Sequence, residues 1–341
     1  MYQSIFPRLG ELPRLTLAQL PTPLEALETL SKALGGPHVL IKRDDQTGLA
    51  MGGNKTRKLE FLLGDARSLG TDTIITAGAA QSNHCRQTVA AARRAGLDCH
   101  LVLGGEAGQA PQGNLLLDEL MGATIHWTGM ERRGERMAEL EEELRSQGRR
   151  PYTIPYGGSN PIGAVGYAVA VAELLEQLDA RKLSLDRIVI ASSSGGTHAG
   201  IAVGARAAGL SVPLLGISID KGERDPIPFE QQLAALANAT AGRLGSPGDF
   251  RPEDFALRYE FLGGGYGVVG ALEREAIRLL ARTEAVLLDP VYTGRAMGAL
   301  LALIASGEID RGETVLFWHT GGAPALFAYT AALQVSNDAE R

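Results

Sequence analysis

The sequence is poor in cysteine and in aromatic residues, and it has no long apolar run. Cys85 and Cys99 are the only cysteines in 341 residues and do not form a CxxC pair. This argues against a disulfide framework and a cysteine-based zinc site. No segment approaches the roughly 20 apolar residues that span a membrane, and no basic and apolar leader is recognisable. We therefore expect a cytoplasmic protein without a membrane partner.

A surplus of basic residues is also lacking. The chain carries 33 lysines and arginines against 39 acidic residues, a formal net charge of −6. A nucleic-acid-binding surface needs clustered positive charge, so we expect no nucleic acid partner. Hydrophobic residues make up 45% of the chain, and a chain of this length can bury about 75% of its unfolded surface. The composition thus predicts a globular protein of one large domain or two.

Short apolar segments alternate with amphipathic ones along most of the chain. Strands are expected at 39–42, 73–76, 99–103, 124–127, 152–154, 187–191, 214–219, 259–262, 285–288 and 314–318. Helices are expected from residue 55 and at 81–95, 114–121, 130–147, 161–178, 196–208, 271–283 and 294–305, with a less periodic, helix-rich region at 221–258. This alternation predicts an α/β fold of mostly parallel sheets covered by helices. Ligands of such sheets bind beyond the carboxyl ends of the strands.

One lysine follows a double glycine at the start of a predicted helix. Gly52 and Gly53 let the backbone turn tightly before Lys55, which can hold the amine at the wall of a cleft. The alternative interpretation, a helix start with a solvated basic face, is equally compatible with this heptapeptide. A phosphate-binding P-loop is rejected, because Asn54 intervenes where the pattern requires glycine followed directly by lysine.

Two polar loops follow predicted strands and enter predicted helices. In the first, Ser82, Asn83 and His84 lie where free amide groups and the helix dipole suit an anion, although serine and asparagine also act simply as N-caps. The second, residues 192–198, reads Ser-Ser-Ser-Gly-Gly-Thr-His. Its small side chains expose successive backbone amides and predict a phosphate site. A tight turn without a ligand is the alternative for this second loop.

A glycine-rich segment supports a rival hypothesis. Residues 263–270 contain Gly-x-Gly-x-x-Gly, and Asp289 follows at about the distance expected of a ribose ligand. This pattern is typical of a nicotinamide dinucleotide site. Against it, Tyr266 is bulky where the backbone should approach the pyrophosphate, and Pro290 directly follows the aspartate.

Polar residues also follow the last two predicted strands. Tyr292 and Thr320 could reach a shared cleft; a core aromatic residue and a turn hydroxyl are the alternatives. His84, His198 and His319 have no recognisable metal spacing. We expect them to be structural histidines, and we expect no metal site.

Three of these features together suggest pyridoxal 5'-phosphate: a lysine at a glycine turn, a separate phosphate turn and a polar cleft at strand ends. This cofactor needs an imine-forming lysine, an anion site and a partner for its ring nitrogen. The motifs at 42–45, 52–58, 81–84, 157–160, 289–294 and 319–322 resemble those of the D-cysteine desulfhydrase/1-aminocyclopropane-1-carboxylate deaminase family. The resemblance covers about residues 21–329. It implies the tryptophan synthase β-subunit-like fold (fold type II), with two open, twisted, mostly parallel sheets flanked by helices.

The resemblance also implies an architecture and a set of roles. It implies a large cofactor domain of residues 1–57 and 164–341, a small domain of residues 58–163, an active site between them and a homodimer. Lys55 is implied to carry the cofactor. The further cofactor contacts implied are Lys58, Asn83, Ser194, Gly195, Gly196 and Thr197, with Thr293 or Thr320 at the ring nitrogen. The implied substrate and catalytic contacts are Ser82, Asn83, His84, Gly158, Tyr266 and Tyr292.

Two threonines indicate which activity within the family to expect. The cyclopropane deaminases have glutamate at the position of Thr293 and an apolar residue at that of Thr320. Opening a cyclopropane ring needs a strong electron sink, whereas eliminating a thiolate needs less help from the ring-nitrogen partner. We therefore expect α,β-elimination on D-cysteine, giving pyruvate, hydrogen sulfide and ammonia. L-Cysteate sulfo-lyase, cyclopropane deaminase, nicotinamide-dependent dehydrogenase and a non-catalytic ligand-binding protein are the alternatives.

Overall fold

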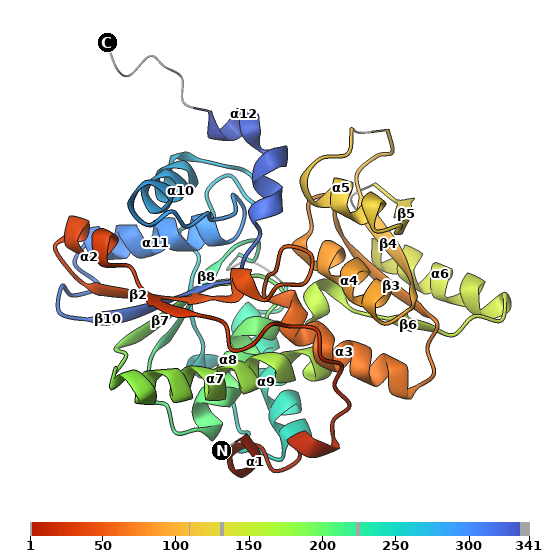
Figure 1. Cartoon of the computed structure of the whole chain (residues 1–341), viewed down its shortest axis with the longest axis horizontal. Coiled ribbons are helices and arrows are strands. Elements are labelled where there is room, and N and C mark those ends of the chain that lie inside the picture. The colour runs from red at the N-terminus through yellow and green to blue at the C-terminus, as the bar shows by residue number, and fades with distance from the viewer. Residues whose placement is uncertain (1, 109, 130–132, 223–225, 335–341) are drawn as a thin grey trace.

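The chain forms two sheets that lie side by side, as the computed structural model in Figure 1 shows. The structure describes residues 2–108, 110–129, 133–222 and 226–334. The larger sheet has the strand order β1-β2-β10-β7-β8-β9, and the smaller one β5-β4-β3-β6. The strands are β1 (Leu24–Ala26), β2 (His38–Arg43), β3 (Thr73–Ala79), β4 (Asp98–Gly104), β5 (Thr124–Trp127), β6 (Pro151–Thr153), β7 (Arg187–Ser192), β8 (Leu214–Ser218), β9 (Ala256–Arg258) and β10 (Thr314–His319).

Nearly all strand pairs are parallel, as the alternation of strands and helices predicts. Only β1 runs antiparallel to its neighbour β2 among the described strands. The carboxyl ends of β7 and β10 therefore point the same way, which brings the loops that follow them together. Parallel strands covered on both faces are continuously apolar; β3, for example, is buried from Thr73 through Gly78.

Helices cover both faces of each sheet. They are α1 (Tyr2–Ile5), α2 (Glu28–Leu34), α3 (Lys55–Ser68), α4 (Asn83–Arg94), α5 (Gly113–Leu120), α6 (Arg133–Ser146), α7 (Pro161–Arg181), α8 (Gly196–Ala207), α9 (Phe229–Leu244), α10 (Ala271–Glu284), α11 (Thr293–Ala305) and α12 (Thr330–Leu333). Helices α2, α10 and α11 lie on one face of the larger sheet, and α7 and α8 on the other (Figure 1). Helices α3 and α4 pack on one face of the smaller sheet, and α6 on the other.

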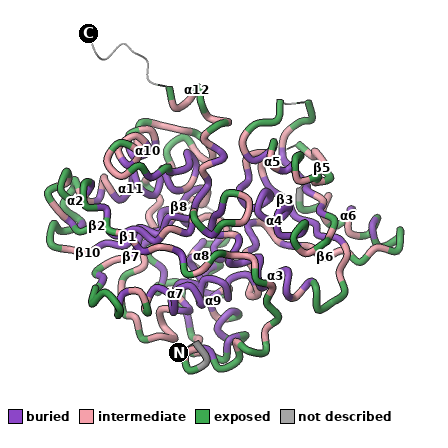
Figure 2. Tube along the Cα trace, in the orientation of Figure 1, coloured by how far each residue is buried: buried purple, intermediate pink, exposed green. Residues whose placement is uncertain are grey.

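The buried residues follow this layering. Figure 2 shows burial concentrated along the strands and the inner helices, with exposed residues at the periphery. Separate apolar clusters fill the space between each sheet and its helices. The smaller sheet therefore has its own core, which is compatible with the predicted small domain. The predicted boundary between residues 57 and 58, however, falls inside α3.

Two of the predicted strands are wrong. The strand expected at 259–262 lies three residues earlier, as β9, and the segment 285–288 pairs with no strand in the described chain. In that segment Val286 and Leu288 are buried while Leu287 is exposed, so the alternation of burial is strand-like although the backbone pairing is absent. The sequence also gave no indication of β1 or α2. The start of the helix predicted from residue 130 lies outside the described residues. No described helix is long and apolar enough to cross a membrane.

Candidate active site

A cleft lies where the loops after β3, β7 and β10 meet the start of α3. Its position beyond the carboxyl ends of parallel strands is the one expected for a ligand. The lining residues are Asn54, Lys55, Ser82, Asn83, His84, Tyr156, Gly157, Ala191, Ser192, Ser193, Ser194, Gly195, Thr197, His198, Tyr292, Thr320 and Gly321. None of these described lining residues carries a carboxylate, so the cleft is suited to anions.

Lys55 is the first residue of α3 and reaches the cleft. Burial lowers the pKa of its amine from 10.5 to about 8, although a hydrogen bond to Lys58 and the charge of Asp220 act in the opposite direction. Burial and the neighbouring Lys55 hold the pKa of Lys58 well below its ordinary value. An amine with a lowered pKa is more often neutral near pH 7, and only the neutral amine is a nucleophile.

The turn after β7 presents backbone amides at the N-terminus of α8. Gly195 has φ +85°, a conformation that glycine adopts without strain. A Cβ atom on Gly196 would lie 2.6 Å from the Ser159 hydroxyl and 2.9 Å from Lys58 Nζ. The Gly196 amide donates to Ser159 Oγ at 3.0 Å, and Lys58 Nζ donates to the same oxygen at 3.2 Å. Two donors therefore converge on the Ser159 hydroxyl, beside a helix dipole that favours negative charge.

The turn after β3 is rigid because of its hydrogen bonds. Ser82 Oγ accepts from the Cys85 amide and so caps α4, but the same residue lines the cleft. Asn83 Oδ1 accepts from Asn114 Nδ2 at 2.9 Å. That bond orients the Asn83 amide, and its Nδ2 group is the end left for a ligand in the cleft.

The three histidines differ in their surroundings. His84 Nε2 lies 2.8 Å from Thr76 Oγ1, which itself donates to Ile154 O, so the imidazole is the donor. His319 Nε2 lies 3.2 Å from Leu287 O. His198 Nδ1 lies 3.1 Å from Ser192 Oγ, but its buried Nε2 has no partner within the described part of the chain. Burial lowers the pKa of all three imidazoles, that of His198 to about 3, so each is neutral near pH 7.

Two tyrosines stand together at the other side of the cleft. The hydroxyls of Tyr266 and Tyr292 are 2.7 Å apart, and their rings meet edge to face. Burial raises the pKa of both phenols well above 10, so both keep their protons near neutral pH. Tyr292 lines the cleft directly, and Tyr266 lies behind it.

The two threonines near the cleft occupy different environments. The Thr293 hydroxyl donates to Asp289 Oδ1 at 2.8 Å and accepts from the Asp289 amide at 2.8 Å, and Thr293 does not line the cleft. Asp289 also accepts from the amides of Val291, Tyr292 and Thr293, which caps α11. Thr320 lines the cleft.

The hydrogen bonds of Asp289 and the position of β9 argue against the hypothesis of a dinucleotide site. That motif requires a strand leading into the glycines and a free carboxylate for the ribose. Here β9 ends at Arg258, and residues 260–267 form turns. Asp289 is fully buried and engaged as the cap of α11.

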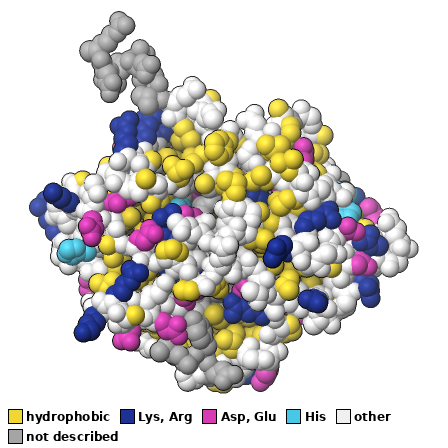
Figure 3. Space-filling view, in the orientation of Figure 1, with side chains coloured by type: hydrophobic (Ala, Val, Ile, Leu, Met, Phe, Trp, Pro, Cys, Tyr) yellow, Lys and Arg dark blue, Asp and Glu magenta, His cyan; other side chains and the backbone are white. Residues whose placement is uncertain are grey.

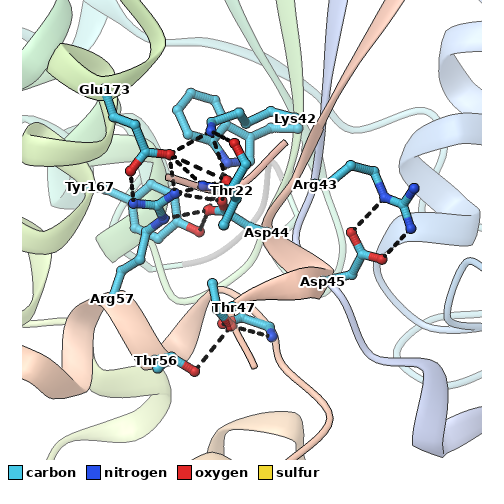
Figure 4. Close-up of polar contacts among 12 residues, drawn as sticks. Thr22, Lys42, Arg43, Asp44, Asp45, Thr47, Thr56, Arg57, Tyr167 and Glu173 are labelled. Atoms are coloured by element: carbon cyan, nitrogen blue, oxygen red, sulfur yellow. Dashed lines mark hydrogen bonds and ion pairs between the residues drawn. The ribbon is translucent and has the colours of Figure 1, made fainter. Parts of the chain in front are cut away.

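A buried cluster of charged side chains holds the start of α3 (Figure 4). Arg57 makes two hydrogen bonds with Asp44, both at 2.9 Å, and two with Glu173 at 2.8 and 3.0 Å. Lys42 Nζ donates to Glu173 at 2.5 Å and to Thr22. The two positive and two negative charges balance, so the cluster is neutral as a whole. It ties α3 to β2 and α7 two residues after Lys55.

Sequence reasoning and structure agree on part of the cleft lining. Residues that line the cleft without having been expected to contact a ligand are Asn54, Tyr156, Gly157, Ala191, Ser192, Ser193, His198 and Gly321. All of them except Tyr156 and Ala191 lie within the motif segments 52–58, 157–160, 192–198 and 319–322, so the motifs marked these regions without identifying the residues that line the cleft. Expected contacts that lie outside the described lining are Lys58, Gly158, Gly196, Tyr266 and Thr293.

Comparison with known proteins identifies the family. A family model for pyridoxal-phosphate dependent enzymes matches residues 15–321. This chain belongs to that family. It is 42% identical over 327 residues to a D-cysteine desulfhydrase of Klebsiella pneumoniae (strain 342) and 43% identical to one of Salmonella typhi. Each alignment covers 94% of this chain and 97% of the relative.

Solved structures agree with the assignment. The crystal structure of an ACC deaminase homologue superposes with a TM-score of 0.89 and 40% identity, covering 98% of this chain and 99% of the other. Threonine deaminase isoform 2 from Solanum lycopersicum has a TM-score of 0.67 at 16% identity and supports the fold alone. The predicted fold type II and the predicted cofactor, pyridoxal phosphate, are thereby confirmed.

The residues of the cleft fit this cofactor. It needs a nucleophilic amine, donors for a phosphate dianion and a polar partner for each end of its ring. The lowered pKa of Lys55 meets the first need, and the amides of Gly195 and Gly196 meet the second. His198 also lines the cleft, and its buried Nε2 has no partner among the described residues.

Proposed function

We propose that this enzyme eliminates hydrogen sulfide from D-cysteine, with uptake of one water, to give pyruvate and ammonia. Two D-cysteine desulfhydrases share 42% and 43% of their residues with it over 94% of the chain. The observation that carries the proposal is the lack of a carboxylate among the described residues that line the cleft. A ring-nitrogen partner that is a hydroxyl suits the loss of a good leaving group better than the opening of a cyclopropane.

Of the two threonines, we assign Thr320 to the ring nitrogen. Thr320 lines the cleft, whereas the Thr293 hydroxyl is engaged with Asp289. Lys55 would carry the cofactor, Asn83 would bond its ring hydroxyl, and Ser194, Gly195, Gly196 and Thr197 would hold its phosphate with help from Lys58. The convergence of Lys58 and the Gly196 amide on the Ser159 hydroxyl supports this phosphate site.

The remaining residues would bind the substrate and move protons. Pyridoxal phosphate, when bound, supplies an electron sink for the α-carbon. The Lys55 amine would take the α-proton, which its lowered pKa permits near neutral pH. Ser82, Asn83, His84 and Gly158 would orient the substrate carboxylate. The protonated phenols of Tyr292 and Tyr266 are the candidates to protonate the departing sulfur, since both hydroxyls share one hydrogen bond.

We further propose that the enzyme is a cytoplasmic homodimer built from the two predicted domains. Exposed apolar side chains gather over α5, η5 (Ala323–Ala328) and α12 on the face shown in Figure 3. Phe327 of η5 is 64% exposed and Leu120 of α5 is 73% exposed, and α5 and η5 are in contact. Apolar surface of this kind is typical of a protein interface.

A substrate panel tests the proposed activity. Release of ammonia, the product common to all four reactions, is measured with D-cysteine, L-cysteine, L-cysteate and 1-aminocyclopropane-1-carboxylate at matched concentrations. We expect the highest kcat/KM with D-cysteine, and the Lys55→Ala variant should lose turnover and the absorbance of the lysine-bound cofactor. A higher kcat/KM with L-cysteate or the cyclopropane acid would overturn the substrate assignment, and an active, yellow Lys55→Ala protein would overturn the role of the lysine.

A further inference from the structure

Four consecutive residues directly before the cleft have a left-handed backbone. Ala50, Met51, Gly52 and Gly53 have φ values of 43°, 69°, 68° and 125°. Glycine adopts such angles freely, but for alanine and methionine the Cβ atom makes them unfavourable. This segment leads into Lys55 through Asn54 alone. Surrounding contacts must therefore hold the segment in this conformation.

Arg86 of α4 supplies two of those contacts. Its guanidinium donates to the carbonyl of Ala50 at 2.6 Å and to that of Gly52 at 3.0 Å. The side chain is fully buried. A planar guanidinium can bond two carbonyls at fixed spacing, so Arg86 fixes the peptide groups 50–51 and 52–53 against α4.

The next residue of α4 supplies the missing cap of α3. Asn54 occupies the N-cap position but caps nothing, because its side chain donates to Thr197 Oγ1 at 3.0 Å. Gln87 Oε1 instead accepts from the Thr56 amide at 2.9 Å and from the Thr56 hydroxyl at 3.0 Å. The same Thr56 amide also donates to Gly53 O at 3.3 Å, so a side chain from another helix adds a second, shorter hydrogen bond at the first turn of α3.

Helix α4 begins with Asn83, so one rigid element carries a wall of the cleft and the two residues that hold the lysine segment. Asn83, Arg86 and Gln87 lie within one turn or so of each other on α4. We propose that Arg86 and Gln87 are positioning residues, which set the distance of the Lys55 amine from Asn83. This inference rests on the proposed role of Lys55, but the geometry of the segment can be tested independently of that role.

Hydrogen–deuterium exchange of the backbone amides in residues 47–57 gives that independent test. It is measured on the full-length holoenzyme and again after removal of the cofactor. We expect Arg86→Met to speed exchange in this segment by about tenfold, and Gln87→Met to speed it at the start of α3. Arg94→Met is the matched control, since Arg94 is exposed on the same helix, and it should leave the segment unchanged. Unchanged exchange in the two buried variants would overturn the inference.

Relief of the backbone strain provides a second, more specific test. Met51 is 54% exposed, so Met51→Gly removes the Cβ penalty without opening a cavity. In the Arg86→Met background, Met51→Gly should restore part of the lost exchange protection and of the lost kcat, whereas a general loss of stability would not respond to this change. Where Arg86→Met does not fold, Arg86→Lys, which keeps one donor group, replaces it. No recovery in either background contradicts the inference.

The absorbance of the lysine-bound cofactor separates this proposal from the proposed function. Displacement of Lys55 should shift the pH titration of that absorbance in Arg86→Lys and raise KM less than it lowers kcat. Faster exchange in the Arg86 variants, with no shift in the pH titration of the cofactor absorbance, would mean that Arg86 holds the segment but does not set the position of Lys55. That result contradicts the positioning role. Failure of the substrate panel leaves the exchange result intact, so the two failures are distinguishable.

Discussion

The role that we propose for Lys55 depends on its buried environment. Burial lowers the pKa of the amine to about 8 from 10.5. Below that value the amine is protonated, so the rate of covalent cofactor attachment to the cofactor-free protein should rise about tenfold per pH unit. The rate should level off above about pH 8. Stopped-flow absorbance measures it, and a rate that keeps rising to pH 10.5 would show an unperturbed lysine.

The lowered pKa of Lys55 also makes the stability of the cofactor-free protein depend on pH. A folded-state pKa below the unfolded one means that the unfolded chain binds more protons between the two values. The Lys55 contribution therefore makes the cofactor-free protein more stable as the pH rises from about 8 to 10.5. Lys55→Met should abolish this part of the pH dependence.

The two threonines provide a matched pair of isosteric variants. Thr320→Val removes a hydroxyl from the cleft and should lower kcat for D-cysteine by about tenfold, the value of one lost hydrogen bond to a charged group. Thr293→Val removes the hydroxyl bonded to Asp289 and should lower Tm with a smaller effect on kcat. Steady-state kinetics and thermal unfolding measure both effects. The reverse pattern would return the ring-nitrogen role to Thr293.

Individual residues were predictable where their chemistry is rare. A lysine after two glycines and a Ser-Gly-Gly turn after a strand carry signals of their own, and both lie in the cleft. The roles of Asp289 and Thr293 could not be predicted, because their local pattern does not distinguish a helix cap from a ligand site. Arg86 gave no signal at all, since its two carbonyl partners lie 34 and 36 residues away.

Among the elements, the start of α3 depends on the buried charge cluster of Figure 4. Burial alone would raise the pKa of Asp44, but Arg57 and the other partners lower it to about 2. Asp44→Asn leaves the buried Arg57 half unpaired and should reduce the free energy of unfolding by about 3–5 kcal/mol. Urea denaturation measures this loss.

The control for that variant is an exposed ion pair. Asp98 pairs with Arg149, and its side chain is 51% exposed. Asp98→Asn should cost about 1 kcal/mol or less. An equal loss of unfolding free energy in Asp44→Asn and Asp98→Asn would show that burial does not make the cluster more important for stability than an exposed ion pair. The depressed pKa also implies that the stability due to Asp44 is present above about pH 4 and is lost as the pH falls toward 2.

The segment 285–288 shows where prediction of elements fails. Its alternating burial satisfies the pattern for a strand, and the pattern reports which side chains face the core. Backbone pairing depends on a neighbouring strand that is remote in sequence, and periodicity contains no information about it. Long apolar helices such as α7 were predicted to within a few residues.

At the scale of the whole molecule, the alternation of strands and helices was sufficient to predict two mostly parallel sheets. The order of the strands was not predictable, because β10, the last strand in sequence, inserts between β2 and β7. That insertion brings Thr320 to the cleft, far in sequence from Lys55. The cleft is thus a product of topology as much as of motifs.

The proposed homodimer is a prediction about the whole molecule. Light scattering on the eluting protein should give twice the chain mass of 36.0 kDa. Phe327→Arg combined with Leu120→Arg should give a folded monomer, since buried charge opposes association. Leu69→Arg is the control, because this exposed leucine follows α3, away from α5 and η5 in Figure 1. A dimer that survives the double variant must use another face.

Helix α3 crosses the predicted boundary between the two bodies without a break. Its first turn is held by the larger sheet through Asp44, and its body packs with α4 on the smaller one. A helix of 14 residues is about 21 Å long. A helix moves as a rigid element, so a rotation at one end also rotates the other end, which a flexible loop would not do. If the smaller sheet moves relative to the larger one, α3 should rotate with it and change the position of the Lys55 amine, since Lys55 is the first residue of this helix.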